Sequence, residues 1–203
     1  MSCSVQLYGH SFVSRLRSFI RDNPSMSYNL GLDSKPMIQY SGFPGGYVQT
    51  LINNQDTVGD FSPKIVLLMI GTNDLSLNRN SPESVADQIM HLSHTLIERH
   101  QVQRVIVLQI LHRRESTLTR YPVDVAWFNA RVDKTNTLLA AKLQASSDKP
   151  VRFWRLKGFW SAQAKQKAFH ADGVHLSSSG QWKLYNNIRA AVVASTNDIN
   201  HLN

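Results

Sequence analysis

The chain has 203 residues, of which 42% are hydrophobic and 18% charged, and this length and composition suit one globular domain over residues 1–203. Its single cysteine, Cys3, excludes an internal disulfide, and its longest apolar run, at residues 65–70, is too short to cross a bilayer. The formal net charge of +8 is compatible with weak contact to nucleic acid or an anionic surface, although a soluble basic enzyme would show the same balance.

Strand-like and helix-like patterns alternate along the sequence. The first half predicts, in chain order, a strand at residues 5–8, a helix at 12–21, a strand at 37–40, a short helix at 48–52 and a strand at 65–70. The second half predicts a helix at 82–99, a strand at 105–110, a helix at 123–143, a strand at 151–154 and a closing helix at 177–194. Ser81 before Pro82 is a typical helix start, and the run at 65–70 is apolar throughout, as expected of a strand buried on both faces.

This alternation predicts an α/β protein with a parallel sheet that helices cover on both faces. In such a sheet, right-handed crossovers bring every strand-to-helix loop to one edge, where ligands bind beyond the carboxyl ends of the strands. Ser11, Gly45 and Asn73 each follow a predicted strand. The topology alone therefore predicts that these three residues lie close together.

Ser11 stands where the first strand turns into the first helix. A serine hydroxyl is a weak nucleophile unless a neighbouring base takes its proton, and the free N–H groups of a helix start suit a developing oxyanion. On position alone, a serine here is more often a helix cap than a nucleophile. The residues that could act with it, which lie far along the chain, favour the nucleophile.

His175 is the candidate base, because histidine is the side chain that exchanges a proton near neutral pH. Asp172, three residues before it, could orient the imidazole if the segment makes a tight turn, and Gly173 would permit that turn. An Asp-Gly turn followed by a surface histidine is the alternative. The apolar residue and the amphipathic helix that follow strengthen the catalytic interpretation.

Asn73 and Gly45 are candidates for holding an oxyanion. A side-chain amide just after a buried strand could donate a hydrogen bond into the pocket, as could a backbone N–H that no side chain obstructs. The same residue types are also common in ordinary turns, here at residues 71–74 and 44–46. Gly46 is an alternative to Gly45 as the backbone donor to the oxyanion.

Four segments, taken in order, resemble the four sequence blocks of the SGNH (GDSL-type) serine hydrolase superfamily: residues 9–11, 42–46, 71–74 and 172–176. The match spans nearly the whole chain. The resemblance implies a flavodoxin-like, three-layer α/β/α sandwich with a parallel sheet of about five strands. It also implies a serine esterase that uses no metal or cofactor and acts on short acyl, above all acetyl, esters. Its substrate would be a small-molecule ester or an acylated sugar or lipid.

The resemblance implies a role for each matching residue. Ser11 would be the nucleophile, His175 the base and Asp172 the third member of a catalytic triad. The oxyanion hole would be formed by the backbone N–H of Ser11 together with Gly45 and Asn73.

One position departs from the family pattern, because the residue before the serine is usually Asp and here it is His10. That Asp is not a triad member, so its replacement bears on the geometry of the loop and on the pH profile. Esterase domains in the first open reading frame of certain LINE-type retrotransposons also vary here, and the resemblance could extend to that subgroup.

Basic and aromatic residues interleave over residues 149–167, a pattern that can bind single-stranded nucleic acid. It motivates a second hypothesis, in which the chain is a nucleic-acid or membrane-surface binding module with little activity. The favoured interpretation of this segment is a core strand followed by a lid loop. Three arginines in the loop after the fourth strand could attract an anionic substrate or simply be solvated: Arg113, Arg114 and Arg120.

Two further features bear on metals and on location. His91 and His94 lie one helical turn apart, but no H-E-x-x-H motif accompanies them, so we expect no metal site. The N-terminus lacks a signal-peptide pattern. Together with the single cysteine, this predicts a cytoplasmic protein or one domain of a longer polypeptide.

Overall fold

The computed structural model describes residues 3–118, 123–143 and 150–201. In this part of the chain five strands form one sheet in which every neighbouring pair is parallel, in the order β2-β1-β3-β4-β5. The strands are β1 (Ser4–His10), β2 (Met37–Phe43), β3 (Ile65–Met69), β4 (Arg104–Leu108) and β5 (Val151–Trp154). The predicted parallel sheet is thereby confirmed.

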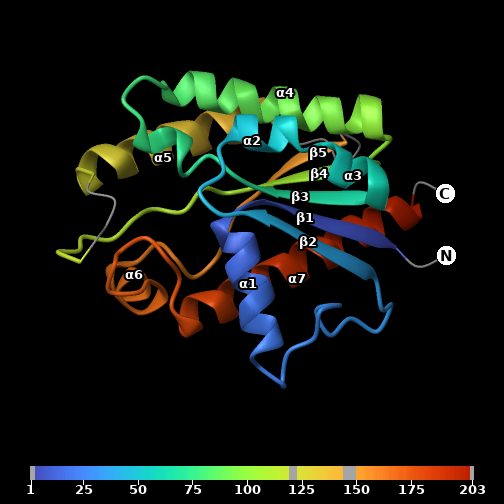
Figure 1. Cartoon of the computed structure of the whole chain (residues 1–203). Helices are drawn as coiled ribbons and strands as arrows, with labels where there is room; N and C mark the ends of the chain where they lie inside the picture. The colour runs from blue at the N-terminus through green and yellow to red at the C-terminus, as the bar shows by residue number, and fades with distance from the viewer. Residues whose placement is uncertain (1–2, 119–122, 144–149, 202–203) are drawn as a thin grey trace.

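Helices cover both faces of the sheet (Figure 1). One face carries α1 (Ser11–Arg21), α6 (Ala162–Ala168) and α7 (Ser178–His201). The other carries α2 (Val48–Asn53), α3 (Asp56–Phe61), α4 (Pro82–His100) and α5 (Val125–Lys142), and a short 3-10 turn, η1 (Asp74–Ser76), follows β3. This is the predicted three-layer α/β/α sandwich.

The central strand β3 shows why both faces need helices. All five of its residues are buried, and alternate side chains point to opposite faces of a strand. Ile65, Leu67 and Met69 join the core under α1 and α7. Val66 and Leu68 join the core under α4 and α5. A strand without a polar face can lie only between two helical layers.

The helix starts also follow from the sequence. Ser81 precedes α4, and its hydroxyl accepts the backbone N–H of Ser84 at 3.1 Å, as expected of an N-cap followed by proline. Asp124 caps α5 in the same way, by accepting the N–H of Trp127 at 2.9 Å. No helix in the described ranges combines the length and the apolar character that a membrane span requires.

Candidate active site

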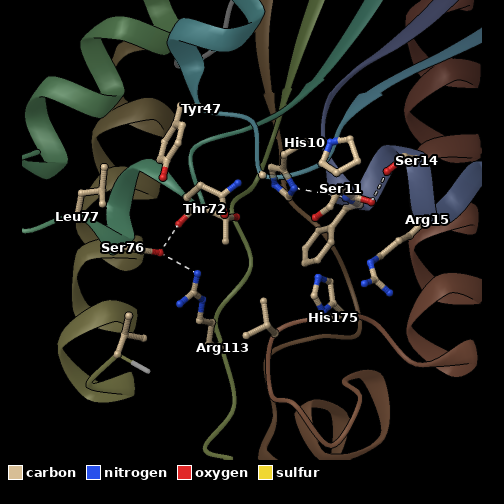
Figure 2. Close-up of a pocket in the computed structure, with 16 residues that line it drawn as sticks. His10, Ser11, Ser14, Arg15, Tyr47, Thr72, Ser76, Leu77, Arg113 and His175 are labelled. Carbon is tan, nitrogen blue, oxygen red and sulfur yellow. Dashed lines mark hydrogen bonds between the residues drawn. The ribbon is translucent and has the colours of Figure 1, made fainter. Parts of the chain in front are cut away.

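A cavity of about 590 Å³ opens at the carboxyl edge of the sheet (Figure 2). Ser11 follows β1, Gly45 follows β2, Asn73 follows β3 and His175 precedes α7, and all four line this cavity. Figure 2 shows Ser11 and His175 on one side of it, with Tyr47 across from them. The structure therefore brings together residues from four separate segments.

His10, rather than Ser11, caps the first helix. Its ring Nδ1 accepts the backbone N–H of Phe12 at 3.4 Å, and the two rings pack edge to face with centroids 4.8 Å apart. Ser11 is the first residue of α1 and is only partly buried beside the cavity. The capping role that position alone favoured for Ser11 thus belongs to its neighbour.

The His10 ring is held neutral. It is 2% exposed, and this burial, followed by the charges of His175 and Arg113, lowers its pKa to about 3. A neutral imidazole can accept the helix N–H, which an Asp at the same position could also do. His10 supplies that acceptor without placing a negative charge beside Ser11.

Asp172 and His175 form a tight pair. The carboxylate Oδ2 lies 2.7 Å from the ring Nδ1, and Oδ1 accepts the backbone N–H groups of Val174 and His175, both at 2.9 Å. Partial burial alone would raise the pKa of Asp172. The hydrogen bonds from His175 and Val174 outweigh that effect and lower the pKa to about 2, so the carboxylate stays ionised beside the imidazole.

Gly173 makes the turn between these two residues possible, as the sequence predicted. Its φ of +72° lies in the left-handed region. A Cβ at this position would come within 2.0 Å of the Arg114 carbonyl oxygen. The backbone N–H of Arg114 also donates to the carbonyl of Gly173 at 2.8 Å. The turn is therefore fixed against the loop that follows β4.

Two adjacent side chains after β3 hold the loop after β2. The amide Nδ2 of Asn73 donates to the carbonyl oxygen of Gly46 at 2.9 Å. The buried carboxylate of Asp74 accepts the backbone N–H of Val48, at the start of α2, at 3.1 Å. Burial raises the pKa of Asp74, and the hydrogen bond from Val48 opposes that rise. The Asn73 amide is thereby anchored to the loop after β2, and the residue lines the cavity.

The two candidate glycines differ in what their N–H groups do. Gly46 donates its N–H to the carbonyl of Phe43 at 2.9 Å, so this group is already used inside the turn. Gly45 lines the cavity with a φ of +72°, and a Cβ there would contact nothing within 4 Å. The backbone conformation, rather than crowding, therefore requires glycine at position 45.

Several cavity residues were not singled out from the sequence: Arg15, Tyr47, Thr72, Ser76 and Leu77. The sequence could have placed Arg15 beside the cavity, because Arg15 follows Ser11 by four residues and so lies on the same face of the helix. Thr72 lies inside residues 71–74, which form one of the four segments that resemble the family's sequence blocks. The other three depend on how the loops fold over the pocket.

The three arginines of the loop after β4 differ in their surroundings. Arg113 lines the cavity and is 5% exposed. Arg114 donates to the backbone carbonyls of Gln166 and His170, which ties the loop to the segment around α6. Arg120 lies outside the described residues.

The aromatic side chains of the basic and aromatic segment pack against the core, while Arg155, Lys157 and Lys167 are exposed. Phe159 is 1% exposed, and Trp154 and Trp160 are partly buried against the same hydrophobic cluster. The indole N–H of Trp160 donates to the carbonyl of Leu156. These contacts agree with the core-strand interpretation, and Lys149 lies outside the described residues. Nucleic-acid contact stays an untested prediction.

Across residues 3–118, 123–143 and 150–201, no group of three His, Cys, Asp or Glu side chains is arranged to hold a metal ion.

A serine and an Asp-paired histidine in one pocket, at the carboxyl edge of a parallel α/β/α sandwich, are typical of serine-dependent hydrolases. The sequence model of the family described as GDSL-like Lipase/Acylhydrolase matches residues 8–188. The chain therefore belongs to the GDSL-like lipase/acylhydrolase family, which is a family of hydrolases. Among curated proteins, a search found no match to this chain.

Solved structures share the fold. A GDSL-like lipase from Bacteroides thetaiotaomicron superimposes with a TM-score of 0.68 at 17% identity, covering 95% of this chain and 88% of that one. A lipase/acylhydrolase from Enterococcus faecalis gives a TM-score of 0.66 at 19% identity, with 94% and 95% covered. An acetyl esterase variant with an acetate ion gives 0.67 at 17% identity, with 97% and 99% covered. The fold class predicted from the sequence is thereby confirmed.

Proposed function

We propose that the protein is a serine esterase that hydrolyses short acyl, above all acetyl, esters of small molecules, including acylated sugars or lipids. One observation carries the proposal. His175 lines the same cavity as Ser11, and its Nδ1 lies 2.7 Å from the ionised carboxylate of Asp172. A base that is oriented in this way, in the same cavity as an otherwise weak hydroxyl nucleophile, meets a requirement for acyl transfer.

The reaction assigned to the site has two stages. His175 Nε2 takes the proton of the Ser11 hydroxyl as Oγ attacks the ester carbonyl carbon, and the carbonyl oxygen becomes an oxyanion. The N–H groups of Ser11 and Gly45 and the Asn73 amide stabilise that oxyanion. His175 then protonates the leaving alcohol. In the second stage, water loses a proton to His175 and attacks the acyl carbon, the bond from that carbon to Oγ breaks, and His175 returns the proton to Oγ, which releases the acid and restores Ser11.

The size of the cavity and two structures that share the fold support the acyl preference. An acetyl esterase and a carbohydrate esterase family 3 protein from Talaromyces cellulolyticus are among the structures that share the fold. Both are named as esterases, and the first holds an acetate ion, the ionised form of the acid that an acetyl ester releases. The cavity of about 590 Å³ is large enough for a small acyl group together with a sugar-sized alcohol.

A covalent label tests the proposal directly. A fluorophosphonate should modify Ser11, as mapped by mass spectrometry, and Ser11→Ala should remove both the label and the hydrolysis of para-nitrophenyl acetate. Ser18→Ala is the matched control, since Ser18 lies on the same helix outside the cavity and should keep both signals. Turnover that persists in Ser11→Ala would exclude this residue as the nucleophile.

A further inference from the structure

Arg113 places a buried positive charge in the wall of the proposed active site. The residue is 5% exposed and lines the same cavity as Ser11 and His175. Its Nη2 donates to the hydroxyl of Ser76 at 2.7 Å, and its Cζ lies 4.3 Å from the centroid of the Phe128 ring. Figure 2 shows the guanidinium between Ser76 and His175.

Nothing in the described part of the chain neutralises this charge. The side-chain atoms Nε and Nη1 of Arg113 are buried and have no hydrogen-bond partner there. None of the ion pairs among the described residues includes Arg113. Burial without a carboxylate lowers the pKa of the guanidinium. A buried cation is costly unless it is paired, so a group with this environment calls for an anionic partner.

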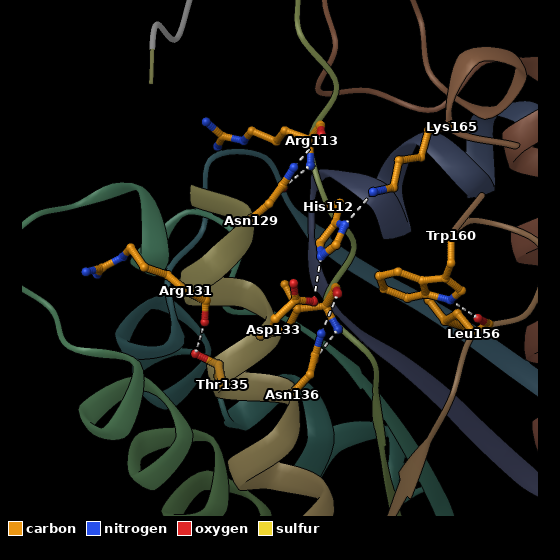
Figure 3. A network of polar contacts seen from close by, with 11 residues as sticks. His112, Arg113, Asn129, Arg131, Asp133, Thr135, Asn136, Leu156, Trp160 and Lys165 are labelled. Carbon is orange, nitrogen blue, oxygen red and sulfur yellow. Dashed lines mark hydrogen bonds and ion pairs between the residues drawn. The ribbon is translucent and has the colours of Figure 1, made fainter. Parts of the chain in front are cut away.

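One side chain of α5 binds both the backbone N–H and the backbone carbonyl of Arg113 (Figure 3). The side chain of Asn129 on α5 accepts the Arg113 N–H at 2.8 Å and donates to the Arg113 carbonyl at 3.0 Å. Asn136, two turns further along α5, binds the N–H and the carbonyl of Ile110 in the same way, both at 2.9 Å. The segment that carries Arg113 is therefore pre-organised without a strand partner, as a binding group should be.

Among the described residues that line the cavity, one further side chain of the Lys, Arg, Asp and Glu types is present, and it is also an arginine. Arg15 lines the cavity from α1, where it is exposed, and Figure 2 shows its side chain next to His175. The described residues that line the cavity include two arginines and no Asp or Glu. Such a wall attracts anions and disfavours cations.

We propose that the physiological ester carries a carboxylate or phosphate group, which the Arg113 guanidinium binds inside the pocket while Ser11 attacks the ester carbonyl. This inference rests on the proposed esterase function. Guanidinium is well suited to the task because its fixed donors match the oxygens of carboxylate and phosphate. The charge can lie on the acyl side or on the alcohol side of the ester.

Matched pairs of esters test the inference. On the alcohol side, para-acetoxybenzoate is compared with its methyl ester. On the acyl side, the mono-para-nitrophenyl ester of adipic acid is compared with the corresponding methyl diester. The readout is the ratio of kcat/KM for the charged ester to that for the neutral ester. In the unmodified protein we expect a ratio of about 10 or more for at least one pair, the effect of one charge-assisted contact.

Substitutions then assign that preference to Arg113. Arg113→Met should reduce the ratio by about 10- to 100-fold, and Arg113→Lys should retain part of it because the charge remains. Arg17→Met removes an exposed arginine of α1 that does not line the cavity, and it should leave the ratio as it was. A ratio near one for both pairs, or a preference that survives in Arg113→Met, would overturn the inference.

The two proposals can fail separately. If para-nitrophenyl acetate is hydrolysed but no charge preference is found, only the anionic substrate is wrong. If no ester is hydrolysed, calorimetric titration of benzoate and adipate still decides, because anion binding needs no turnover. Binding to the Ser11→Ala protein that is lost in Ser11→Ala/Arg113→Met supports the Arg113 site. Binding that is absent from the Ser11→Ala protein, or that the second substitution does not weaken, refutes it.

Discussion

Asp172 holds His175 at two points, because its Oδ2 lies 2.7 Å from the ring Nδ1 while its Oδ1 accepts the backbone N–H of the same residue at 2.9 Å. The first contact favours the tautomer with a proton on Nδ1, which leaves Nε2 free to act as a base. The second contact fixes the backbone from which the ring extends. One carboxylate therefore sets both the protonation pattern and the position of the candidate base.

Asp172→Asn should lower kcat for acetyl ester hydrolysis by about 10³- to 10⁴-fold with little change in KM, because an amide cannot hold the reactive tautomer. Asp133→Asn is the matched control. Asp133 pairs with His112 Nε2 at the same 2.7 Å, but neither residue lines the cavity. Steady-state kinetics on both variants make the comparison. A similar loss in the two variants would indicate a general effect of carboxylate removal rather than a role in the site.

Asn73→Ala should lower kcat by about 10²- to 10³-fold, the usual effect of losing one oxyanion donor. Asn80→Ala controls for the loss of a loop amide. Asn80 also donates from Nδ2 to a backbone carbonyl, that of Asp74 at 3.0 Å, yet it does not line the cavity. Asn73 would lose its proposed catalytic role if KM rose while kcat stayed constant, because that pattern indicates ground-state binding.

The buried His10 should make the protein sensitive to acid. Its pKa is lowered from 6.5 to about 3 in the folded state, so below pH 6.5 the unfolded chain binds a proton that the folded chain does not. The free energy of unfolding should therefore fall as the pH decreases from 6.5 towards 3, by up to about 1.4 kcal/mol per pH unit for this one group.

Urea unfolding at several pH values measures this slope, and His10→Asn should flatten it. Asparagine keeps an acceptor for the Phe12 N–H but does not titrate. The same substitution at the exposed His94 controls for the loss of a histidine as such. An unchanged slope in His10→Asn would show that another group causes the acid sensitivity.

The sequence predicted the long elements and missed two short helices. Helix α3 has six residues and includes Gly59, and α6 has seven residues of which only Ala168 is buried. Helices this short do not form in isolation, and neither shows the apolar stripe from which a helix is recognised. Their contacts with the rest of the fold stabilise them, and these contacts are not visible in a local window of sequence.

The predicted strand at residues 105–110 was too long for a related reason. Its apolar pattern continues to Ile110, but β4 ends at Leu108. The backbone groups of Ile110 bind the side chain of Asn136 instead of a neighbouring strand. Asn129 and Asn136 are seven residues apart and share a helix face, but nothing local indicates that this face would hold an extended segment.

The sequence predicted which segments meet at the candidate site better than it predicted the charged group that would select a substrate. Ser11 and Asn73 follow strands directly, so the topology of a parallel sheet brings them to one edge. The sequence offered Arg113 only together with Arg114 and Arg120, as arginines of a polar loop that could attract an anionic substrate or simply be solvated. The burial of Arg113 depends on Phe128 and Ser76, which come from other segments, and a sequence read along the chain does not show that they meet.

Asn136→Ala should destabilise the fold more than most substitutions of a single polar residue. Asn136 is 6% exposed, and its loss would leave the buried N–H and carbonyl of Ile110 without partners, at a cost of about 2–4 kcal/mol in the free energy of unfolding. Asn187 makes the same two contacts with the N–H and the carbonyl of Lys157, at 2.8 and 3.1 Å, in an exposed setting. Water can replace Asn187, so Asn187→Ala should cost less than about 1 kcal/mol. Urea unfolding of both variants measures the difference, and equal losses would mean that the burial of the Ile110 backbone is not what Asn136 protects.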